Sequence, residues 1–177
     1  MGAGAGQPLI LVCRERPNAW NKGTTGDIYA RFRKELVRAF DEAGRPRLDG
    51  LLYGIIYWFV RGYDGPRHPD ADNISKPVWD MLSTRGKDTP TNETRLGAYE
   101  DDKQVRLRVA GIIDLAPARL GPDAPEAEQF VLPSFPEEVA LRFDEFIQDG
   151  ASQHFTYVEC GPLRPSMFAS SFVGGRG

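Results

Sequence analysis

The apolar run from Leu51 to Val60 is the feature that most constrains how this chain can fold. Ten residues are too few to cross a bilayer as a helix, which takes about 20 residues. A near-continuous apolar run of this length predicts a buried strand, and we expect that strand to occupy residues 48–63 with a bulge at Gly54. A polar loop rich in glycine and proline follows and leads directly to an acidic segment.

Helical and extended patterns alternate along the rest of the chain. Helices are expected to begin at Asp27 as an N-cap, at Asp70 or Asp72, and at Ser134, which has Glu137 three residues later. Pro77 fits the second helix if it lies in the first turn, where its missing N–H costs little. Further strands are expected at residues 8–13 and 155–160, and from Asp102 or Gln104 to Ile112.

Composition limits the classes of protein that need to be considered. The 177 residues are 41% hydrophobic and 27% charged, as in an ordinary globular domain. Two cysteines and two histidines, each isolated, exclude a cysteine-based zinc site and a histidine-rich metal site, so oxygen atoms would have to bind any metal. The first seven residues have no basic region before an apolar segment, so we expect a cytoplasmic protein without membrane association.

The net charge of -3 is unevenly distributed. Residues 1–108 contain 18 basic and 15 acidic side chains, which gives 18 - 15 = +3, and the remainder contains 4 and 10, which gives 4 - 10 = -6. A nucleic-acid partner would therefore be met by the first two-thirds of the chain.

Two short pieces of the chain each place two aspartates within three residues, Asp70 with Asp72 and Asp101 with Asp102. Close carboxylates repel, and a divalent cation such as magnesium or manganese removes that repulsion. Lys76, one helical turn beyond Asp72, is placed to hold a phosphate. If the strand after Asp102 pairs beside the apolar strand, Asp70, Asp72 and Asp102 converge at one end of a sheet. The pattern then predicts metal-assisted phosphodiester hydrolysis.

Each piece also has an ordinary structural interpretation. Asp70 or Asp72 alone is typical of a helix N-cap, and Asp101 with Asp102 is typical of a solvated turn. Lys76 can also bridge Asp72 and Asp80 along one helix face.

The order of these residues resembles that of the RusA-type Holliday-junction resolvases. That family has Asp-x-Asp-Asn-x-x-Lys, an Asp-x-Leu one turn later, and Asp-Asp-x-Gln-Val after a loop. Here the three pieces are Asp-Ala-Asp-Asn-Ile-Ser-Lys at residues 70–76, Trp-Asp-Met-Leu at residues 79–82 and Asp-Asp-Lys-Gln-Val at residues 101–105. The resemblance covers about residues 8–115.

The resemblance implies a RusA-like α+β domain over residues 1–115, a small mixed β-sheet with two to three helices packed on it. Residues 116–177 would be an acidic C-terminal extension (linker, helix, strand and tail) packed on the same domain. It also implies a homodimer that nicks four-way DNA junctions in recombination and repair, using Mg²⁺ with Mn²⁺ as a substitute.

The resemblance also assigns the site residues. Asp70, Asp72 and Asp102 would be the metal ligands, Lys76 the catalytic or phosphate-contacting lysine, and Asp80 would act indirectly. DNA contacts are expected from Arg67, Asn73, Lys76 and Lys103.

Three alternatives remain open. The chain could be a junction-binding protein of this fold that does not cut, or a metal nuclease acting on other branched DNA or on RNA. It could also bind other proteins through its acidic C-terminal third. The loop at residues 85–98 is longer than the family's usual turn and could either touch the junction arms or be decoration.

Overall fold

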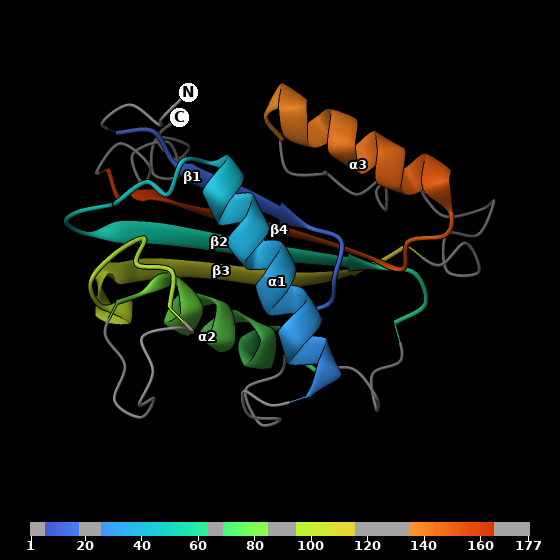
Figure 1. The fold of residues 1–177 in the computed structure, drawn as a ribbon, viewed down its shortest axis with the longest axis horizontal. Coiled ribbons are helices and arrows are strands. Elements are labelled where there is room, and N and C mark those ends of the chain that lie inside the picture. Colours follow the sequence, from blue (N-terminus) through green and yellow to red (C-terminus); the bar gives the residue numbers. More distant parts are fainter. Residues whose placement is uncertain (1–5, 18–25, 64–68, 85–94, 116–134, 165–177) are drawn as a thin grey trace, which may run out of the picture.

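The computed structural model describes residues 6–17, 26–63, 69–84, 95–115 and 135–164. These residues form an α+β fold with a four-stranded mixed sheet in the order β1-β4-β2-β3 and three α-helices (Figure 1). The expected α+β class, with a small mixed sheet and helices packed on it, is confirmed. The strands are β1 (Leu9–Cys13), β2 (Leu52–Val60), β3 (Val105–Asp114) and β4 (His154–Pro162). The α-helices are α1 (Asp27–Glu42), α2 (Ala71–Leu82) and α3 (Glu137–Asp149), and a short 3-10 helix, η3 (Asp102–Gln104), precedes β3.

The apolar run forms β2, which is an inner strand. It pairs in parallel with β3 and antiparallel with β4. Ile56 and Trp58 face the core beneath α1 and α2, whereas Phe59 faces α3 on the other side of the sheet. Because β2 is buried on both faces, its sequence is apolar throughout instead of alternating with polar residues.

The irregularity in this strand lies next to the position expected from the sequence. The register between β2 and β3 shifts at Leu52 and Tyr53, so the expectation of a bulge at Gly54 itself is wrong. Gly54 serves another purpose, because the indole of Trp79 from α2 packs directly on it. A Cβ atom at Gly54 would lie 2.5 Å from Cη2 of Trp79, so only glycine allows α2 this close to the sheet.

The C-terminal part of the chain contributes an inner strand of the sheet. β4 lies between β1 and β2 and pairs antiparallel with both. α3 covers the same part of the sheet from the face opposite α1 and α2, with the rings of Phe59 and Phe143 4.8 Å apart. Arg61 donates hydrogen bonds of 2.9 Å to the carbonyls of Phe146 and Ile147, near the C-terminal end of α3.

The helix starts differ in detail from those expected. Asp27 lies in the first turn of α1, and Gly26 is the N-cap. α3 begins at Glu137 with Pro136 as its N-cap, two residues after the expected cap Ser134, which lies outside the described residues. α2 begins at Ala71, so Pro77 lies in its second turn, and the expectation that it occupies the first turn is wrong.

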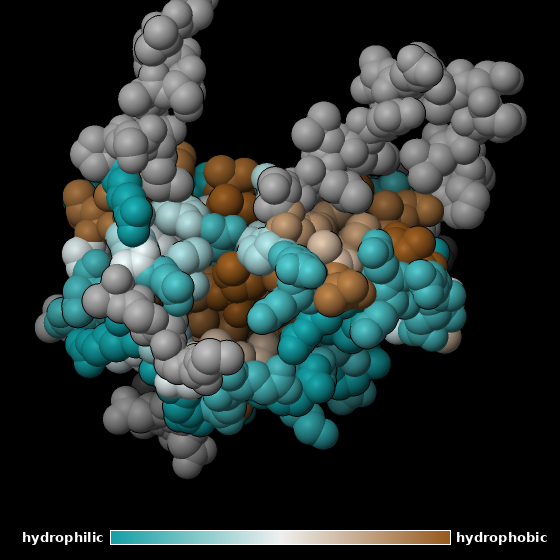
Figure 2. All heavy atoms as spheres, turned by 90° about the horizontal axis from the view of Figure 1, so that it is seen from above, coloured by the Kyte–Doolittle hydropathy of each residue, from teal (hydrophilic) through white to brown (hydrophobic). Residues whose placement is uncertain are grey.

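Seen from the top of Figure 1, apolar side chains gather near the centre of the molecule and the α1 side is hydrophilic (Figure 2). Among the described residues, the large apolar side chains with the greatest exposure are Leu51, Val109, Leu141 and Ile147. None of the helices in the described part of the chain combines the length and apolar character needed to cross a bilayer.

Candidate functional site

The second helix connects two parallel strands, and this fixes where the two acidic pieces lie. β2 and β3 run in the same direction, so α2 has to return across the sheet between them. Asp70 and Asp72 follow the C-terminal end of β2, whereas Asp102 directly precedes the N-terminal end of β3. In a parallel pair these ends lie at opposite edges, so the predicted convergence of all three aspartates at one end of the sheet is wrong.

α2 separates the two pieces along its length. Asp72 and Asp80 are eight residues apart on the helix, or about 12 Å at 1.5 Å per residue. Within the described residues, no group of three or more His, Cys, Asp or Glu side chains is close enough to hold a metal ion. The structure therefore places Asp70 and Asp72 together at the start of α2, and Asp102 near its other end.

Contacts between residues 79–84 and Tyr99 hold the end of α2 against the segment that leads to η3. Ser83 forms a parallel bridge with Tyr99, and Thr84 N–H donates to the Tyr99 carbonyl at 2.8 Å. The buried Tyr99 hydroxyl in turn donates to the carbonyl of Trp79 in α2 at 2.7 Å. The turn that carries Asp102 is thus fixed against the C-terminal half of α2.

Asp80 and Asp102 are the two carboxylates that this arrangement brings into one neighbourhood. Burial raises the pKa of Tyr99 well above the usual tyrosine value, the carboxylates of Asp102 and Asp80 raise it further, and Arg108 lowers it. All three charged groups therefore lie within electrostatic reach of one phenol. Asp80, to which the resemblance gives an indirect role, and Asp102 thus act on the same phenol.

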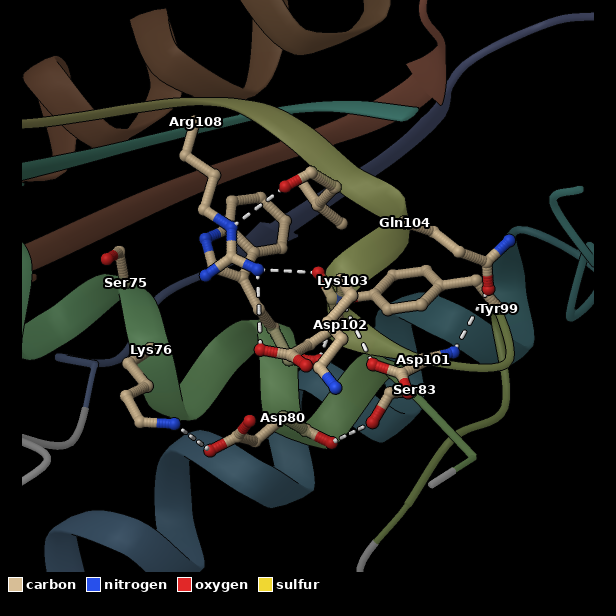
Figure 3. Close-up of polar contacts among 12 residues, drawn as sticks. Ser75, Lys76, Asp80, Ser83, Tyr99, Asp101, Asp102, Lys103, Gln104 and Arg108 are labelled. Carbon is tan, nitrogen blue, oxygen red and sulfur yellow. Dashed lines mark hydrogen bonds and ion pairs between the residues drawn. The ribbon is translucent and has the colours of Figure 1, made fainter. Parts of the chain in front are cut away.

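Each of these carboxylates forms an ion pair with one cation. Lys76 Nζ lies 3.4 Å from Asp80 Oδ2 along α2, and Arg108 Nη2 lies 3.3 Å from Asp102 Oδ2 (Figure 3). The four side chains are between 27% and 44% exposed, so each pair contributes little to stability, about 0–1 kcal/mol. The pairs instead fix where two negative and two positive charges stand beside α2. The sequence alternative in which Lys76 pairs along its helix is confirmed for Asp80.

The η3 turn gives its two aspartates different tasks. The Asp101 carboxylate accepts the N–H of Lys103 at 2.9 Å and caps the turn. The Gln104 side chain completes this capping box, because its Oε1 accepts the N–H groups of Glu100 and Asp101 at 2.9 and 3.0 Å. Its Nε2 donates to the Gly50 carbonyl at 3.0 Å and ties the turn to the loop before β2. Asp101 thus shapes the turn, and Asp102 carries the carboxylate paired with Arg108.

The start of α2 shows a similar division. Asp70 is the N-cap, and its carboxylate accepts the N–H of Asn73 at 2.9 Å. Asp72 lies in the first turn with its side chain exposed, where the helix dipole favours a negative charge. Lys103 is exposed on η3, and Arg67 lies outside the described residues.

Two arginines contribute contacts that the sequence patterns did not reveal. Arg108 reaches back six residues to Asp102, although strand alternation alone indicates only which face of β3 it occupies. Arg95 Nη1 donates to Ser83 Oγ at 2.6 Å and to the Asp80 carbonyl at 3.0 Å, so it holds the C-terminal end of α2. In the sequence, both contacts could have been inferred only from an arginine near a motif aspartate. That pattern is too common to predict a particular contact.

The oxygen donors at these positions are of the type that a hard divalent cation binds, but the described residues do not gather three of them at one place. Carboxylate oxygens are the ligands that magnesium prefers, and it takes one or two of them together with waters and substrate phosphate oxygens. Asp102 and Asp80 are each already paired with a cation of the chain, Arg108 and Lys76 respectively, which a metal ion would have to displace. Asp102 and the Asp70–Asp72 pair are therefore two candidate ligand positions, one towards each end of α2.

Comparisons with known proteins do not assign a family to the chain. No protein-family model matches the sequence, and no curated protein matches it significantly.

Proposed function

We propose that the protein is a Mg²⁺-dependent, structure-selective endonuclease that nicks four-way DNA junctions, as its resemblance to the RusA-type resolvases implies. One observation carries this proposal. α2 presents Asp70, Asp72 and Lys76 in order, and the turn carrying Asp102 is fixed beside the other half of the same helix. Two motif pieces far apart in the chain thus belong to one layer of the fold, on the face of the sheet that α2 covers.

In this proposal the chain's residues hold and orient a phosphodiester. Asp70 and Asp72 at the start of α2 would offer one set of carboxylates to Mg²⁺, and Asp102 towards the other end of the helix would offer a separate one. A bound Mg²⁺ would lower the pKa of a water and neutralise charge on the phosphate. Lys76 lies one turn from Asp72 and one turn from Asp80, so its ammonium group can reach a phosphate oxygen beside α2. Its ion pair with Asp80 positions that ammonium group before substrate arrives.

The rest of the proposal concerns DNA and assembly. Backbone contacts would come from Arg67, Asn73, Lys76 and Lys103, and residues 1–108, with their charge of 18 - 15 = +3, would face the phosphates. A homodimer would present two sites to opposite strands, because a two-fold protein matches a junction with two-fold symmetry. A cytoplasmic location agrees with a DNA substrate.

A labelled synthetic four-way junction, compared with linear duplex in the presence and absence of Mg²⁺, tests the proposal. Wild type is compared with Asp72→Asn and Asp102→Asn, and Asp144→Asn, on the exposed side of α3, removes the same charge from the opposite face as a control. We expect junction-selective, Mg²⁺-dependent nicking that both site variants lose and the control keeps. Equal cutting of duplex and junction would refute the assignment of four-way junctions as the substrate. Cutting that both site variants retain would refute the assignment of Asp72 and Asp102 to the active site.

A junction-binding protein that does not cut is the second candidate. The observation that favours it is the charge balance beside α2, where Asp80 and Asp102 are each paired with a cation from the chain itself. Binding of the junction without nicking in Mg²⁺ or Mn²⁺ would support this candidate over the nuclease.

A further inference from the structure

The loop after β1 holds Arg16 in place through its neighbours. Arg14 forms an ion pair with α3, and Pro17 is buried. The buried Thr156 hydroxyl donates to the Glu15 carbonyl at 2.8 Å. The Arg16 side chain itself is half-buried, yet no hydrogen bond or ion pair binds its guanidinium group within the described part of the chain. The loop is therefore fixed while the five N–H donors of Arg16 remain available to a ligand.

A second guanidinium group stands near that of Arg16. Arg31 lies in the second turn of α1 with its side chain 61% exposed, and its Nε is 3.8 Å from the Glu15 carboxylate. Within the described residues, Glu15 is the only carboxylate at ion-pair distance from either arginine. Burial lowers the pKa of Arg16, and the positive charge of Arg31 lowers it further. Two like charges thus lie within electrostatic reach of each other.

The direction of the strands places these cations at a particular end of the sheet. β1 and β2 are both antiparallel to β4, so they run in the same direction and their C-terminal ends lie at the same end of the sheet (Figure 1). Arg16 follows the C-terminal end of β1, and α2 begins after the C-terminal end of β2 with Asp70 as its cap. Arg16 and the first motif piece therefore lie towards the same end of the sheet.

An anion would relieve both unfavourable features of this arrangement. A half-buried charge without a partner has lost part of its hydration, and two like charges repel each other. The planar guanidinium group presents paired N–H donors that match the oxygens of a phosphate group. A phosphate group is therefore the ligand that best fits Arg16 and Arg31.

We propose that Arg16 and Arg31 form a phosphate-binding site at the end of the sheet where α2 begins, and that this site takes a backbone phosphate of DNA. The inference rests on the proposed function only in its choice of DNA as the source of the phosphate, and it requires no metal ion. The two arginines are additional to the DNA contacts that the resemblance implies. A free phosphate ion has the same chemistry and is the alternative source.

Binding of a fluorescently labelled four-way junction to the full chain, in EDTA and over a series of KCl concentrations, measures the contribution of each arginine. We expect Arg16→Gln and Arg31→Gln each to weaken binding about tenfold. Each should also reduce the slope of the logarithm of the binding constant against that of the KCl concentration by about one, as for the loss of one phosphate contact. Arg16→Lys keeps the charge and should keep most of the slope. Arg38→Gln is the matched control, an exposed arginine of α1 paired with Glu35 at 2.7 Å, and it should change the affinity less than about twofold.

Thermal unfolding without DNA separates a binding role from a structural one. Arg16→Gln removes a half-buried charge that has no partner, so this variant should melt at the same temperature as wild type or higher. An arginine that holds the loop would instead give a lower melting temperature on replacement, and that result would overturn the inference. Because the Arg31 side chain is exposed, Arg31→Gln should fold whatever the outcome at Arg16, and its DNA binding tests the site independently.

Inorganic phosphate, added in place of chloride at constant ionic strength, tests the alternative source. A melting temperature that phosphate raises in wild type but not in Arg16→Gln, together with equal junction binding by the two, would overturn the assignment to DNA in favour of free phosphate. Equal binding of the junction by wild type and both site variants, or no binding by wild type, would overturn the inference. Failure of junction nicking with the expected binding results intact would count against the proposed nuclease alone.

Discussion

Replacing Gly54 by alanine should destabilise the protein through a single steric conflict between β2 and α2. The added Cβ atom would lie 2.5 and 2.8 Å from Cη2 and Cζ2 of Trp79 and 2.9 Å from Cγ1 of Val105. Trp79 is 0% exposed and Val105 is 3% exposed, so neither side chain can turn into solvent. α2 therefore has to move away from the sheet, and the candidate site moves with it.

The magnitude follows from two opposing effects. Overpacking of a filled core costs about 1–3 kcal/mol, and contact with three buried atoms at under 3 Å favours the upper part of that range. Replacing glycine by alanine also restricts the unfolded chain, which offsets about 0.4–1 kcal/mol. The net loss in the free energy of unfolding is about 1–2 kcal/mol, or about 2–8 °C in Tm for a chain of this size.

Denaturant unfolding followed by circular dichroism, with a thermal melt, measures this loss. Gly111→Ala is the matched control, because its Cβ would meet the half-buried ring of Tyr57 at 3.0 Å on the other face of the sheet. We expect it to change stability by less than about 0.5 kcal/mol, since that ring can yield.

A double-mutant cycle with Trp79→Phe tests the cause of the loss. Phenylalanine lacks the indole atoms that approach Gly54, so alanine at position 54 should cost at least about 1 kcal/mol less in that background. A Gly54→Ala protein as stable as wild type, or a cost independent of residue 79, would refute this account of how α2 is held on the sheet.

Three further predictions follow from other described contacts. Burial raises the pKa of both Tyr53 and Tyr157 far above the usual tyrosine value near 10. The stability that these two residues contribute is therefore complete below about pH 10 and is lost as the pH rises above it. Denaturant titrations at about pH 8 and about pH 10.5 should show this decline, and equal stability at the two pH values would contradict it. Burial likewise raises the pKa of the Cys13 thiol, and it raises that of Cys160 to about 12. Neither thiol should therefore react with a thiol reagent at neutral pH until the protein unfolds. Rapid labelling of the folded chain would argue against this packing. Gln104→Glu keeps the two hydrogen bonds that the side chain accepts but loses the one that it donates to the Gly50 carbonyl before β2. This loss should lower the free energy of unfolding by about 1–2 kcal/mol, measured by denaturant titration. An unchanged midpoint would show that the donated hydrogen bond does not stabilise the turn.

Much of the local structure could be predicted because it follows from short-range patterns. The apolar run predicted β2, and Asp70 was one of two candidates for the cap of α2 because an aspartate before an apolar periodicity accepts the first free N–H groups. The pairing of β2 with the strand after Asp102 was the condition on which the predicted site depended, and the two strands do pair.

The arrangement of the site could not be predicted to the same extent. The direction of β3 relative to β2 is set by the crossover through α2, and the residues of β3 do not encode it. That direction places Asp72 and Asp102 towards opposite ends of α2. The reach of Arg108 to Asp102 likewise depends on the turn geometry, which Gln104 and Asp101 establish together.

The place of β4 in the sheet has a consequence for how the protein is made. β1 lies at residues 9–13 and pairs with residues 156–160, so nearly the whole described chain must leave the ribosome before the sheet can close. Such long-range pairing folds slowly, and an incomplete sheet gives α2 and η3 no finished surface on which to pack. A nascent chain would therefore carry all the motif residues discussed here without their arrangement. Whatever activity that arrangement confers would begin only after synthesis has passed β4.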